Sequence, residues 1–283
     1  MISTHQIDID GLPQVYHVAG SGPVCVVHSG GPGIGWESLR MPALEQHLTM
    51  VYLEPIGTGD SGRLAQVRDY RLDTYLRFLN GVVAHLGDER VFLLGHSHGG
   101  FVVQRFALAH PDRVAGLVLY DTSPVTGEEF WAAAMEGVAA FQKRHAGQPG
   151  AEDVVKAFQE ALQAVDDATL TAAFARFIPL YLHDYWGRRD EFAGYIAGIR
   201  AWADPQHGEE PERFDVRARL GEITAPTLVV AGRHDFICGV RWAGMLHHGI
   251  PGSRLVVLEN SGHLGHLEEP AEFRRAVVGF VSG

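Results

Sequence analysis

Short runs of apolar residues alternate with helical patterns along the first 121 residues. The runs are rich in Val and Leu: VCVVH (24–28), MVYLEP (50–55), VFLLG (91–95) and GLVLYD (116–121). Continuous apolar runs of this length are typical of strands in a parallel sheet that is covered on both faces. Between the second and third runs, the apolar residues of 75–86 recur with the spacing of one helix face. The alternation predicts an α/β fold with a doubly wound, mostly parallel sheet.

The two ends of the chain extend this pattern. QIDID and QVYHV, joined by the turn residues Gly11 and Pro13, predict an antiparallel hairpin before the first parallel strand. Near the other end, TLVVAG (227–232) and RLVVLEN (254–260) predict two more strands, and EPAEFRRAVVGFV closes the chain as a helix.

The middle of the chain breaks the alternation. Residues 124–220 contain the Ala-rich runs WAAAMEGVAAF and DATLTAAFARF and no convincing strand, and Ala225-Pro226 marks the return to strands. An insertion of this length is too long for a plain loop, and such insertions over a sheet commonly act as lids. We therefore expect a core of 1–123 and 221–283, with a helical cap at 124–220 inserted after the sixth strand.

Composition limits the classes of partner. The 283 residues carry a formal net charge of −11, which argues against nucleic acid and anionic lipid. No stretch approaches the roughly 20 apolar residues of a membrane span, and MISTHQIDID does not read as a signal peptide. Cys25 and Cys238 are too few for a disulfide framework, so we expect free thiols in a reducing, cytoplasmic setting. The sequence leaves the oligomeric state open.

Ser97 stands at an abrupt junction between a predicted strand and a predicted helix. Gly95-His96-Ser97-His98-Gly99 matches the pattern G-x-S-x-G, and FVVQRFALAH follows it as a helix. A nucleophile on such a sharp turn needs glycines on either side, and the positive end of the helix favours developing negative charge. A plain structural turn remains the alternative interpretation, but the context favours a nucleophilic serine.

Two later loops supply a base and an orienting acid for such a serine. Strand TLVVAG runs into Asp235, and strand RLVVLEN runs into His263. Both residues follow the carboxyl ends of strands, the edge of an open α/β sheet where sites are built. The order Ser, Asp, His along the chain is the one expected of an α/β-hydrolase.

These stretches together resemble the α/β-hydrolase family. The resemblance covers nearly the whole chain outside the cap and rests on the GGPG loop, GTGDSG, GHSHGG, AGRHD and SGHLGHLEEP. It implies Ser97 as nucleophile, Asp235 as acid and His263 as base, with no cofactor and a small-molecule substrate. Asp121 stands at a known alternative acid position, although a turn or capping role is favoured. His266 is expected to support the catalytic loop rather than to act as the base.

Acyl transfer also requires donors for an oxyanion. We expect one backbone N–H donor from His98, directly after the nucleophile, and one from the Gly-rich loop at 28–33. Within this loop Gly31 is favoured and Gly30 is the alternative. A plain Gly/Pro turn is the alternative for this loop.

GGPG is similar to the HGGPG loop of the proline iminopeptidase branch, whose members also carry a helical cap. The likeness is partial, because Ser29 replaces the usual His and histidines flank Ser97 where that branch has Gly and Trp. We therefore favour a small ester, lactone or amide as substrate, and release of an N-terminal proline is the alternative. Esterases, lactonases and carbon–carbon bond hydrolases share the motifs that do not depart from the iminopeptidase pattern. A non-catalytic ligand-binding protein of the same fold is a lesser alternative.

Other chemistries fit less well. Serine at 97 argues against epoxide hydrolases and haloalkane dehalogenases, which use aspartate there. The chain has 16 histidines but no HExxH or HxHxDH arrangement, so we expect no metal, and GTGDSG lacks the GK[ST] ending of a phosphate loop. His247 and His248 are expected on a solvated helix.

The cap is acidic and aromatic. Between Pro124 and Arg217 there are 16 acidic residues against 9 Lys and Arg, which accounts for −7 of the chain's charge. Tyr181, Tyr185 and Trp186 lie in the stretch YLHDYW. They are candidates for substrate binding, because an acidic, aromatic cap could hold a cationic amino terminus beside an apolar ring. The alternative interpretation, that these aromatic residues pack the cap onto the core, is favoured.

Overall fold

The computed structural model describes residues 1–208 and 213–283, and its centre is one eight-stranded sheet with the order β1-β2-β4-β3-β5-β6-β7-β8. β2 pairs antiparallel with β1 and with β4, and the remaining pairs are parallel. This confirms the predicted α/β class and the hairpin. The strands are β1 (Ile2–Ile9), β2 (Leu12–Gly20), β3 (Val24–His28), β4 (Thr49–Leu53), β5 (Val91–His96), β6 (Val114–Tyr120), β7 (Thr227–Gly232) and β8 (Arg254–Leu258).

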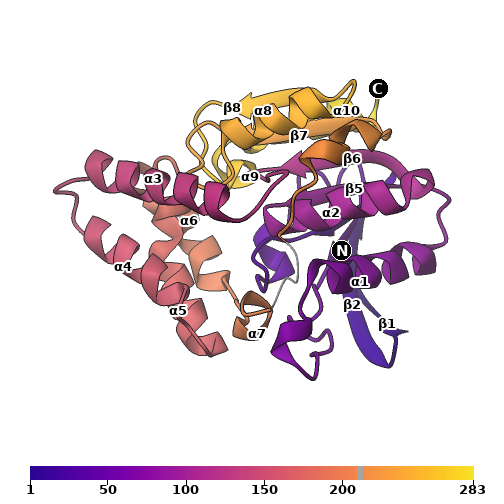
Figure 1. The fold of residues 1–283 in the computed structure, drawn as a ribbon, viewed down its shortest axis with the longest axis horizontal. Coiled ribbons are helices and arrows are strands. Elements are labelled where there is room, and N and C mark those ends of the chain that lie inside the picture. The colour runs from indigo at the N-terminus through magenta and orange to yellow at the C-terminus, as the bar shows by residue number, and fades with distance from the viewer. Residues whose placement is uncertain (209–212) are drawn as a thin grey trace.

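Helices cover both faces of the sheet (Figure 1). One face packs against α1 (Leu72–Leu86), α2 (His98–Ala109) and α8 (Val240–Gly249). The other packs against α10 (Pro270–Val281) and the segment 36–48, which opens with the 3₁₀ helix η1 (Trp36–Leu39). The central strands are therefore buried on both sides, which explains why they read as continuous apolar runs rather than as alternating ones.

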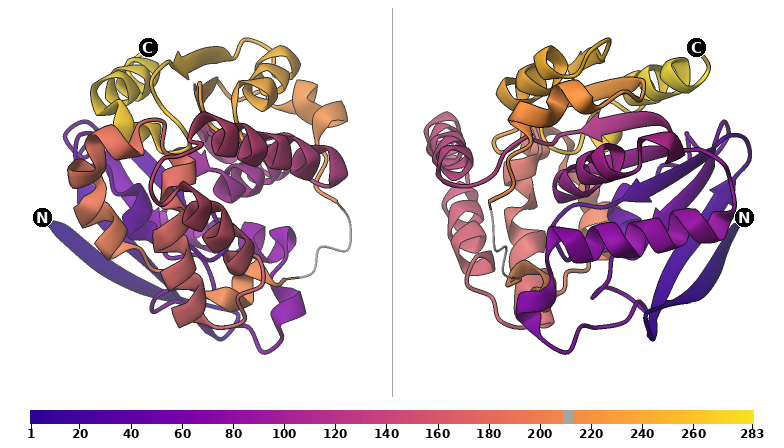
Figure 2. Two further views of the ribbon diagram at one scale, coloured as in Figure 1. Left: turned by 90° about the vertical axis from the view of Figure 1, so that its left-hand side faces the viewer. Right: turned by 45° about the vertical axis from the view of Figure 1, so that its right-hand side comes forward.

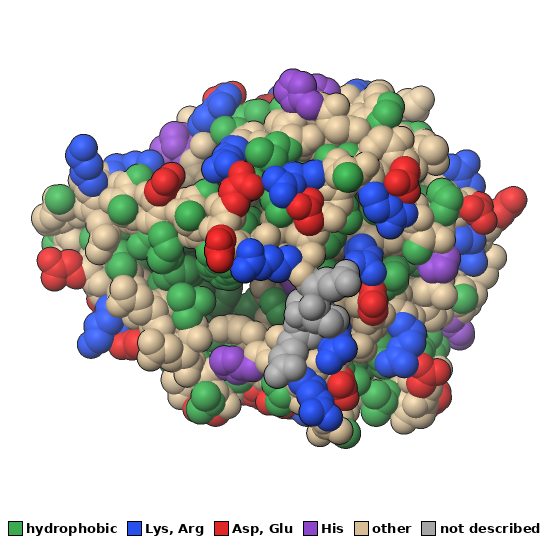
Figure 3. All heavy atoms as spheres, in the orientation of Figure 1, with side chains coloured by type: hydrophobic (Ala, Val, Ile, Leu, Met, Phe, Trp, Pro, Cys, Tyr) green, Lys and Arg blue, Asp and Glu red, His purple; other side chains and the backbone are tan. Residues whose placement is uncertain are grey.

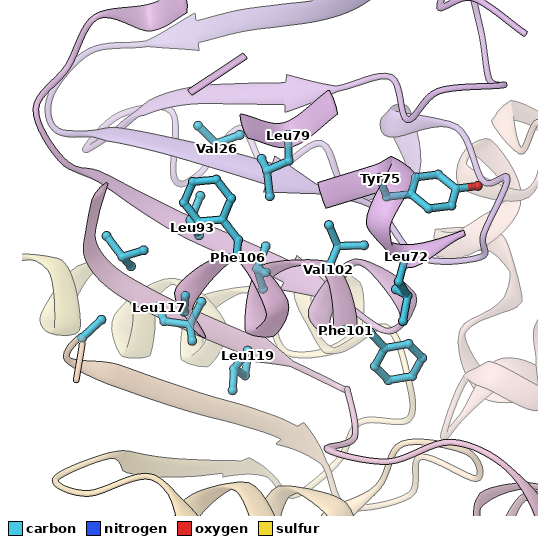
Figure 4. Close-up of a cluster of buried hydrophobic side chains, with 14 of the residues drawn as sticks. Val26, Leu72, Tyr75, Leu79, Leu93, Phe101, Val102, Phe106, Leu117 and Leu119 are labelled. Carbon is cyan, nitrogen blue, oxygen red and sulfur yellow. The ribbon is translucent and has the colours of Figure 1, made fainter. Parts of the chain in front are cut away.

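The larger core cluster lies between the sheet and helices α1 and α2. Figure 4 shows Leu79 of α1 and Phe106 of α2 close to Val26 and Leu93 of the sheet, and Leu117 of β6 belongs to the same cluster. All five side chains are essentially inaccessible to solvent. This packing fixes α2 against β5, and so fixes the turn between them.

The region after β6 is helical, as predicted. It contains α3 (Glu128–Arg144), α4 (Ala151–Ala161), α5 (Asp167–Phe177), η4 (Ile178–Tyr181), α6 (Tyr185–Gly198) and α7 (Ala203–Gln206). These cap helices form a layer of their own beside the sheet (Figures 1 and 2). They share an apolar cluster to which the core contributes Ile34 and Leu264. Within the described ranges, no helix is long and apolar enough to cross a bilayer.

The remaining elements are short. They are η2 (Val67–Asp69), η3 (Pro111–Arg113), η5 (Arg217–Glu222) and α9 (Gly265–Glu268). Predicted strand limits differ from the observed ones by one or two residues at some ends: β4, β6 and β8 stop at 53, 120 and 258, and β6 begins at 114. Polar residues follow the last residues of β4, β6 and β8, and three of them, Glu54, Asp121 and Glu259, form side-chain contacts of their own.

Candidate active site

Ser97 occupies a strained turn between β5 and α2. Its backbone has φ 53° and ψ −120°, a left-handed conformation that is uncommon for a residue with a side chain. Two hydrogen bonds connect the turn to β6 and to the segment directly after it: Ser97 N donates to Tyr120 O at 3.1 Å, and Thr122 Oγ1 donates to Ser97 O at 2.8 Å. The strain is therefore sustained by the adjacent strand β6.

The glycines around Ser97 are sterically required. A Cβ on Gly99 would overlap the carbonyl oxygen of His28 at the end of β3, and a Cβ on Gly95 would overlap the backbone of α2. On the facing loop, a Cβ on Gly30 would lie 2.9 Å from Cβ of Ser97. Small residues thus let the serine, the helix and the loop at 28–33 approach one another closely.

Asp235 and His263 meet at the ends of β7 and β8. His263 Nδ1 donates to Asp235 Oδ2 at 2.7 Å, and the two side chains are 3% and 0% exposed. Backbone N–H groups of Ile237 and Cys238 donate to the other oxygen, Asp235 Oδ1, at 2.9 and 3.1 Å. With Nδ1 as the donor, Nε2 of His263 carries a free lone pair, the form required of a general base.

The loop that carries His263 is held from two sides. Its N–H donates to Tyr181 O of the cap at 2.7 Å, and its carbonyl accepts a hydrogen bond from His96 Nε2 at 2.9 Å. Burial lowers the pKa of His96 well below its usual value, so this imidazole is neutral and donates through Nε2. His96, beside the serine in sequence, thereby ties β5 to the His263 loop.

His266 takes part in a separate buried network. Its Nδ1 lies 3.0 Å from Tyr120 Oη, and its Nε2 lies 2.9 Å from Ser38 O. Burial lowers the pKa of His266 to about 4, which keeps the ring neutral. Asp235 pairs with His263 and not with His266, so His266 stands beside the site as a support.

Asp121 forms the turn after β6. Its backbone has φ 41°, its N–H donates to Val230 O at 2.9 Å, and its Oδ1 accepts from Gly232 N at 2.7 Å. The carboxyl thus caps the end of β7, the kind of role favoured from the sequence.

Some of the residues expected to bind an oxyanion line a cavity, whereas His98 is absent from its described lining. Gly30, Gly31 and Ser97 all line it, and His98 is the first residue of α2, directly after the serine. Gly31 has φ +119°, and a Cβ there would lie 2.6 Å from Gly33 N. This backbone conformation requires glycine. Burial lowers the pKa of His98 to about 3, so its ring adds no charge to the site.

The cavity itself lies between the cap and the core. It measures about 260 Å³, and Figure 3 shows hydrophobic side chains gathered around a hollow on this part of the surface. Within the described ranges, Asp, Glu, Lys and Arg are absent from its lining. The lining consists of Gly30, Gly31, Pro32, Ile34, Ser38, His96, Ser97, Trp131, Phe158, Ala161, Leu162, Leu170, Phe174, Phe177, Tyr181, Tyr195, Gln206, His207, Ile237, His263 and Leu264.

Comparison with known proteins identifies the family. Residues 23–270 match the family described as the alpha/beta hydrolase fold. The chain belongs to the α/β-hydrolase family. Membership agrees with the sheet order, the cap after β6 and the serine turn after β5.

Relatives within the α/β-hydrolase family act on different substrates. The 2-hydroxy-6-oxononadienedioate/2-hydroxy-6-oxononatrienedioate hydrolase of Klebsiella pneumoniae is 30% identical over 268 residues, which cover 93% of this chain and 88% of the relative. Among solved structures, the enol-lactonase of Burkholderia xenovorans LB400 has a TM-score of 0.75 at 21% identity, covering 99% of this chain and 100% of the other. Proline iminopeptidase of Mycobacterium smegmatis has a TM-score of 0.74 at 22% identity, covering 99% and 98%. At these identities the structures share the fold alone.

The three aromatic residues of YLHDYW separate in this α/β-hydrolase. Tyr181 lines the cavity, with its ring centroid 4.8 Å from that of His263. Among the described lining residues, Tyr185 and Trp186 are absent, and the Trp186 ring instead packs 4.6 Å from His145. They separate because α6 begins directly after Asp184, whose side chain caps this helix by accepting a hydrogen bond from Gly187 N.

Sequence reasoning missed most of the cavity wall. α5 contributes Leu170, Phe174 and Phe177, which recur at positions i, i+4 and i+7 of one helix face. That periodicity was available in the sequence, but it predicts only a buried face and not what the face covers. Tyr195 of α6 and His207 reach the cavity with no local signal.

Proposed function

We propose that this α/β-hydrolase cleaves small, neutral carboxylic esters or lactones whose acyl part is apolar. Ser97 is the nucleophile, His263 the general base and Asp235 the acid that orients the base. The support is the hydrogen bond from His263 to Asp235, together with the shared cavity that Ser97 and His263 line.

The reaction proceeds through an acyl-enzyme. His263 Nε2 takes the proton of Ser97 Oγ as that oxygen attacks the substrate carbonyl carbon. N–H groups of His98 and Gly31 donate to the resulting oxyanion, and Gly30 is the alternative to Gly31. His263 then gives its proton to the leaving alkoxide, and a water molecule activated by the same nitrogen hydrolyses the acyl-enzyme. These steps need no cofactor.

The uncharged cavity lining carries the substrate assignment. A buried charge without a partner costs several kcal/mol, so a site for a charged substrate normally supplies an opposite charge. The relative named for a dienedioate acts on a molecule with two carboxylates. Within the part of the chain that the structure describes, the cavity offers such a molecule neither Lys nor Arg.

The same observation weighs against release of an N-terminal proline. A protonated amine would need a carboxylate partner, and none lines the cavity within 1–208 and 213–283. Several acidic residues of the cap instead form ion pairs away from the cavity lining, as Asp153 and Glu160 do with Arg176. Glu209, Glu210 and Glu212, part of the cap's acidic excess, lie outside the described residues.

The cavity also sets a size and a shape. At about 260 Å³ it lies just below the range of about 300–1,000 Å³ typical of ligand pockets. Phe158, Phe174 and Tyr181 provide aromatic walls that suit a planar or branched apolar group. We expect an acyl group about the size of phenylacetyl to fit between them.

A size-matched substrate series tests this proposal. The p-nitrophenyl esters of phenylacetic acids bearing a para methyl, carboxylate or aminomethyl group differ in charge at nearly constant size. We expect kcat/KM to favour the methyl compound by about 100-fold or more, because each charged group would be buried unpaired. A preference for the carboxylate would assign the chain to the dioate hydrolases.

A second pair of substrates tests the peptidase alternative. Prolyl p-nitroanilide should react slowly, and its N-acetylated form at a similar rate. A preference of 100-fold or more for the free amine would overturn the proposal in favour of an iminopeptidase. Absence of turnover with every substrate, joined to absence of fluorophosphonate labelling, would support a non-catalytic ligand-binding protein.

A further inference from the structure

A second carboxyl group lies beside the proposed triad acid. Asp121 follows β6 and Asp235 follows β7, and these strands are neighbours in the sheet. Both side chains are completely buried. Asp121 contributes no step to the mechanism above, yet one of its carboxyl oxygens lies within 4.8 Å of a ring nitrogen of His263 and of one of His96.

The two oxygens of Asp121 have different surroundings. Oδ1 accepts the hydrogen bond from Gly232 N. Oδ2 is buried and accepts no hydrogen bond from any residue that the structure describes. Asp235 is a charged neighbour of this buried carboxyl, and its charge raises the pKa of Asp121. Two buried carboxylates that approach each other repel, unless one of them carries a proton that it shares with the other.

The distribution of donors decides which carboxyl is protonated. Asp235 accepts from Ile237 N, Cys238 N and His263 Nδ1, three donors that stabilise its ionised form. Asp121 accepts a hydrogen bond from only one described donor, Gly232 N. A carboxylate has about four acceptor positions, and a hydroxyl of Asp121 would fill the fourth position on Asp235.

The electrostatic surroundings point the same way. Burial first, and then the charge of Asp235, raise the pKa of Asp121 well above its ordinary value. Glu268 adds a further negative charge when it is ionised, and His96 is neutral because burial lowers its pKa well below the ordinary value. The titratable groups around Asp121 are Tyr120, His96, Asp235, Cys238, His263 and Glu268.

We propose that Asp121 is a protonated carboxylic acid that donates a hydrogen bond to the Asp235 carboxylate and so acts as a positioning residue for the triad acid. The inference rests on the proposed function only in taking Asp235 as that acid. The pair then carries a single negative charge, held on Asp235. The bond fixes the orientation of Asp235 toward His263, and the charge of the Asp235 carboxylate offsets the imidazolium charge that forms during turnover.

Infrared spectroscopy of the full chain tests the protonation directly. At pH 8 the wild type should show the C=O stretch of a buried protonated carboxyl group, and Asp121→Asn should lose it. Asp88→Asn, which alters an exposed carboxyl, should leave the band unchanged. Absence of a band that depends on Asp121 would overturn the proposal. This measurement needs no substrate, so its failure and that of the proposed ester hydrolysis can be distinguished.

Kinetics of two variants test the positioning role. The amide of Asp121→Asn keeps both the donor and the acceptor, so kcat/KM should stay within about threefold of wild type and the acidic limb of its pH profile should not move. Asp121→Leu removes the donor and should lower kcat about 10-fold or more. If Asp121→Asn moves the acidic limb down by one pH unit or more, Asp121 carries a charge in the wild type and the proposal is wrong.

Discussion

Glu268 is a buried carboxyl that joins the cap to the loop of the proposed base. Its Oε2 accepts from Gly262 N at 2.6 Å, next to His263, and its Oε1 accepts from His183 N of the cap at 2.7 Å. Burial raises the pKa of Glu268 to about 7, although these N–H donors and Asp184 N act in the opposite direction. We expect this carboxyl to make the stability of the protein depend on pH.

The sign and size follow from proton linkage. Between pH 4.5 and about 7 the folded protein keeps a proton on Glu268 that the unfolded chain releases. The free energy of unfolding therefore falls as the pH rises through this window. A pKa that rises from 4.5 to about 7 makes ionisation in the folded state cost about 3 kcal/mol more than in the unfolded chain. Most of this, about 2–3 kcal/mol, should develop between pH 5 and pH 8.

Urea unfolding of wild type and Glu268→Gln, followed by circular dichroism at pH 5 and pH 8, measures this effect. The variant does not titrate at this position, so its stability relative to wild type should rise by about 2–3 kcal/mol from pH 5 to pH 8. Glu136→Gln, which removes an exposed carboxyl of α3, should change the difference little. A stability difference between Glu268→Gln and wild type that is the same at both pH values would refute the reasoning.

Three further predictions concern the site and its scaffold. Asp235→Asn should lower kcat about 10⁴-fold at pH 8 because the amide favours the wrong tautomer of the base; a loss below tenfold would remove Asp235 from the role of acid. Circular dichroism should show loss of structure as the pH falls from 6.5 toward 4, because His98 and His266 bind protons in the unfolded chain but stay neutral when buried in the folded protein. A signal that is unchanged down to pH 4 would contradict this prediction. Gly99→Ala should lower the free energy of unfolding by more than about 2 kcal/mol through overlap with a carbonyl of β3, whereas Gly279→Ala, with open space around it, should raise it by about 0.5–1 kcal/mol. Equal effects of the two alanines, measured by urea unfolding, would disprove the steric account.

The fold could be predicted because its signals are local. Continuous apolar runs mark strands covered on both faces, and the chemistry-bearing residues directly follow three of those runs. Ser97, Asp235 and His263 each stand just beyond the carboxyl end of a strand, so a parallel sheet brings them to one edge. The hydrogen bond between Asp235 and His263 is the consequence in the structure.

The remaining features depend on contacts between segments far apart in the sequence. Glu268 contacts the cap across 85 residues, and Asp121 and Asp235 follow strands that are neighbours in the sheet although they lie far apart in the sequence. The cavity wall combines helices of the cap with loops of the core, and local patterns do not record such pairings. In YLHDYW the start of a helix after Asp184 separates Tyr181, which lines the cavity, from Tyr185 and Trp186 of α6, which are absent from its described lining.

Covalent labelling of Ser97 tests the central claim most directly. The full chain is treated with a fluorophosphonate and digested, and the modified peptide is mapped by mass spectrometry while hydrolysis of p-nitrophenyl phenylacetate is followed in parallel. We predict a single adduct on Ser97, loss of ester hydrolysis in proportion to labelling, and neither labelling nor turnover in Ser97→Ala, whose fold should be unchanged. An adduct on another serine, or ester hydrolysis that persists in Ser97→Ala at a comparable rate, would contradict the assignment of Ser97 as the nucleophile.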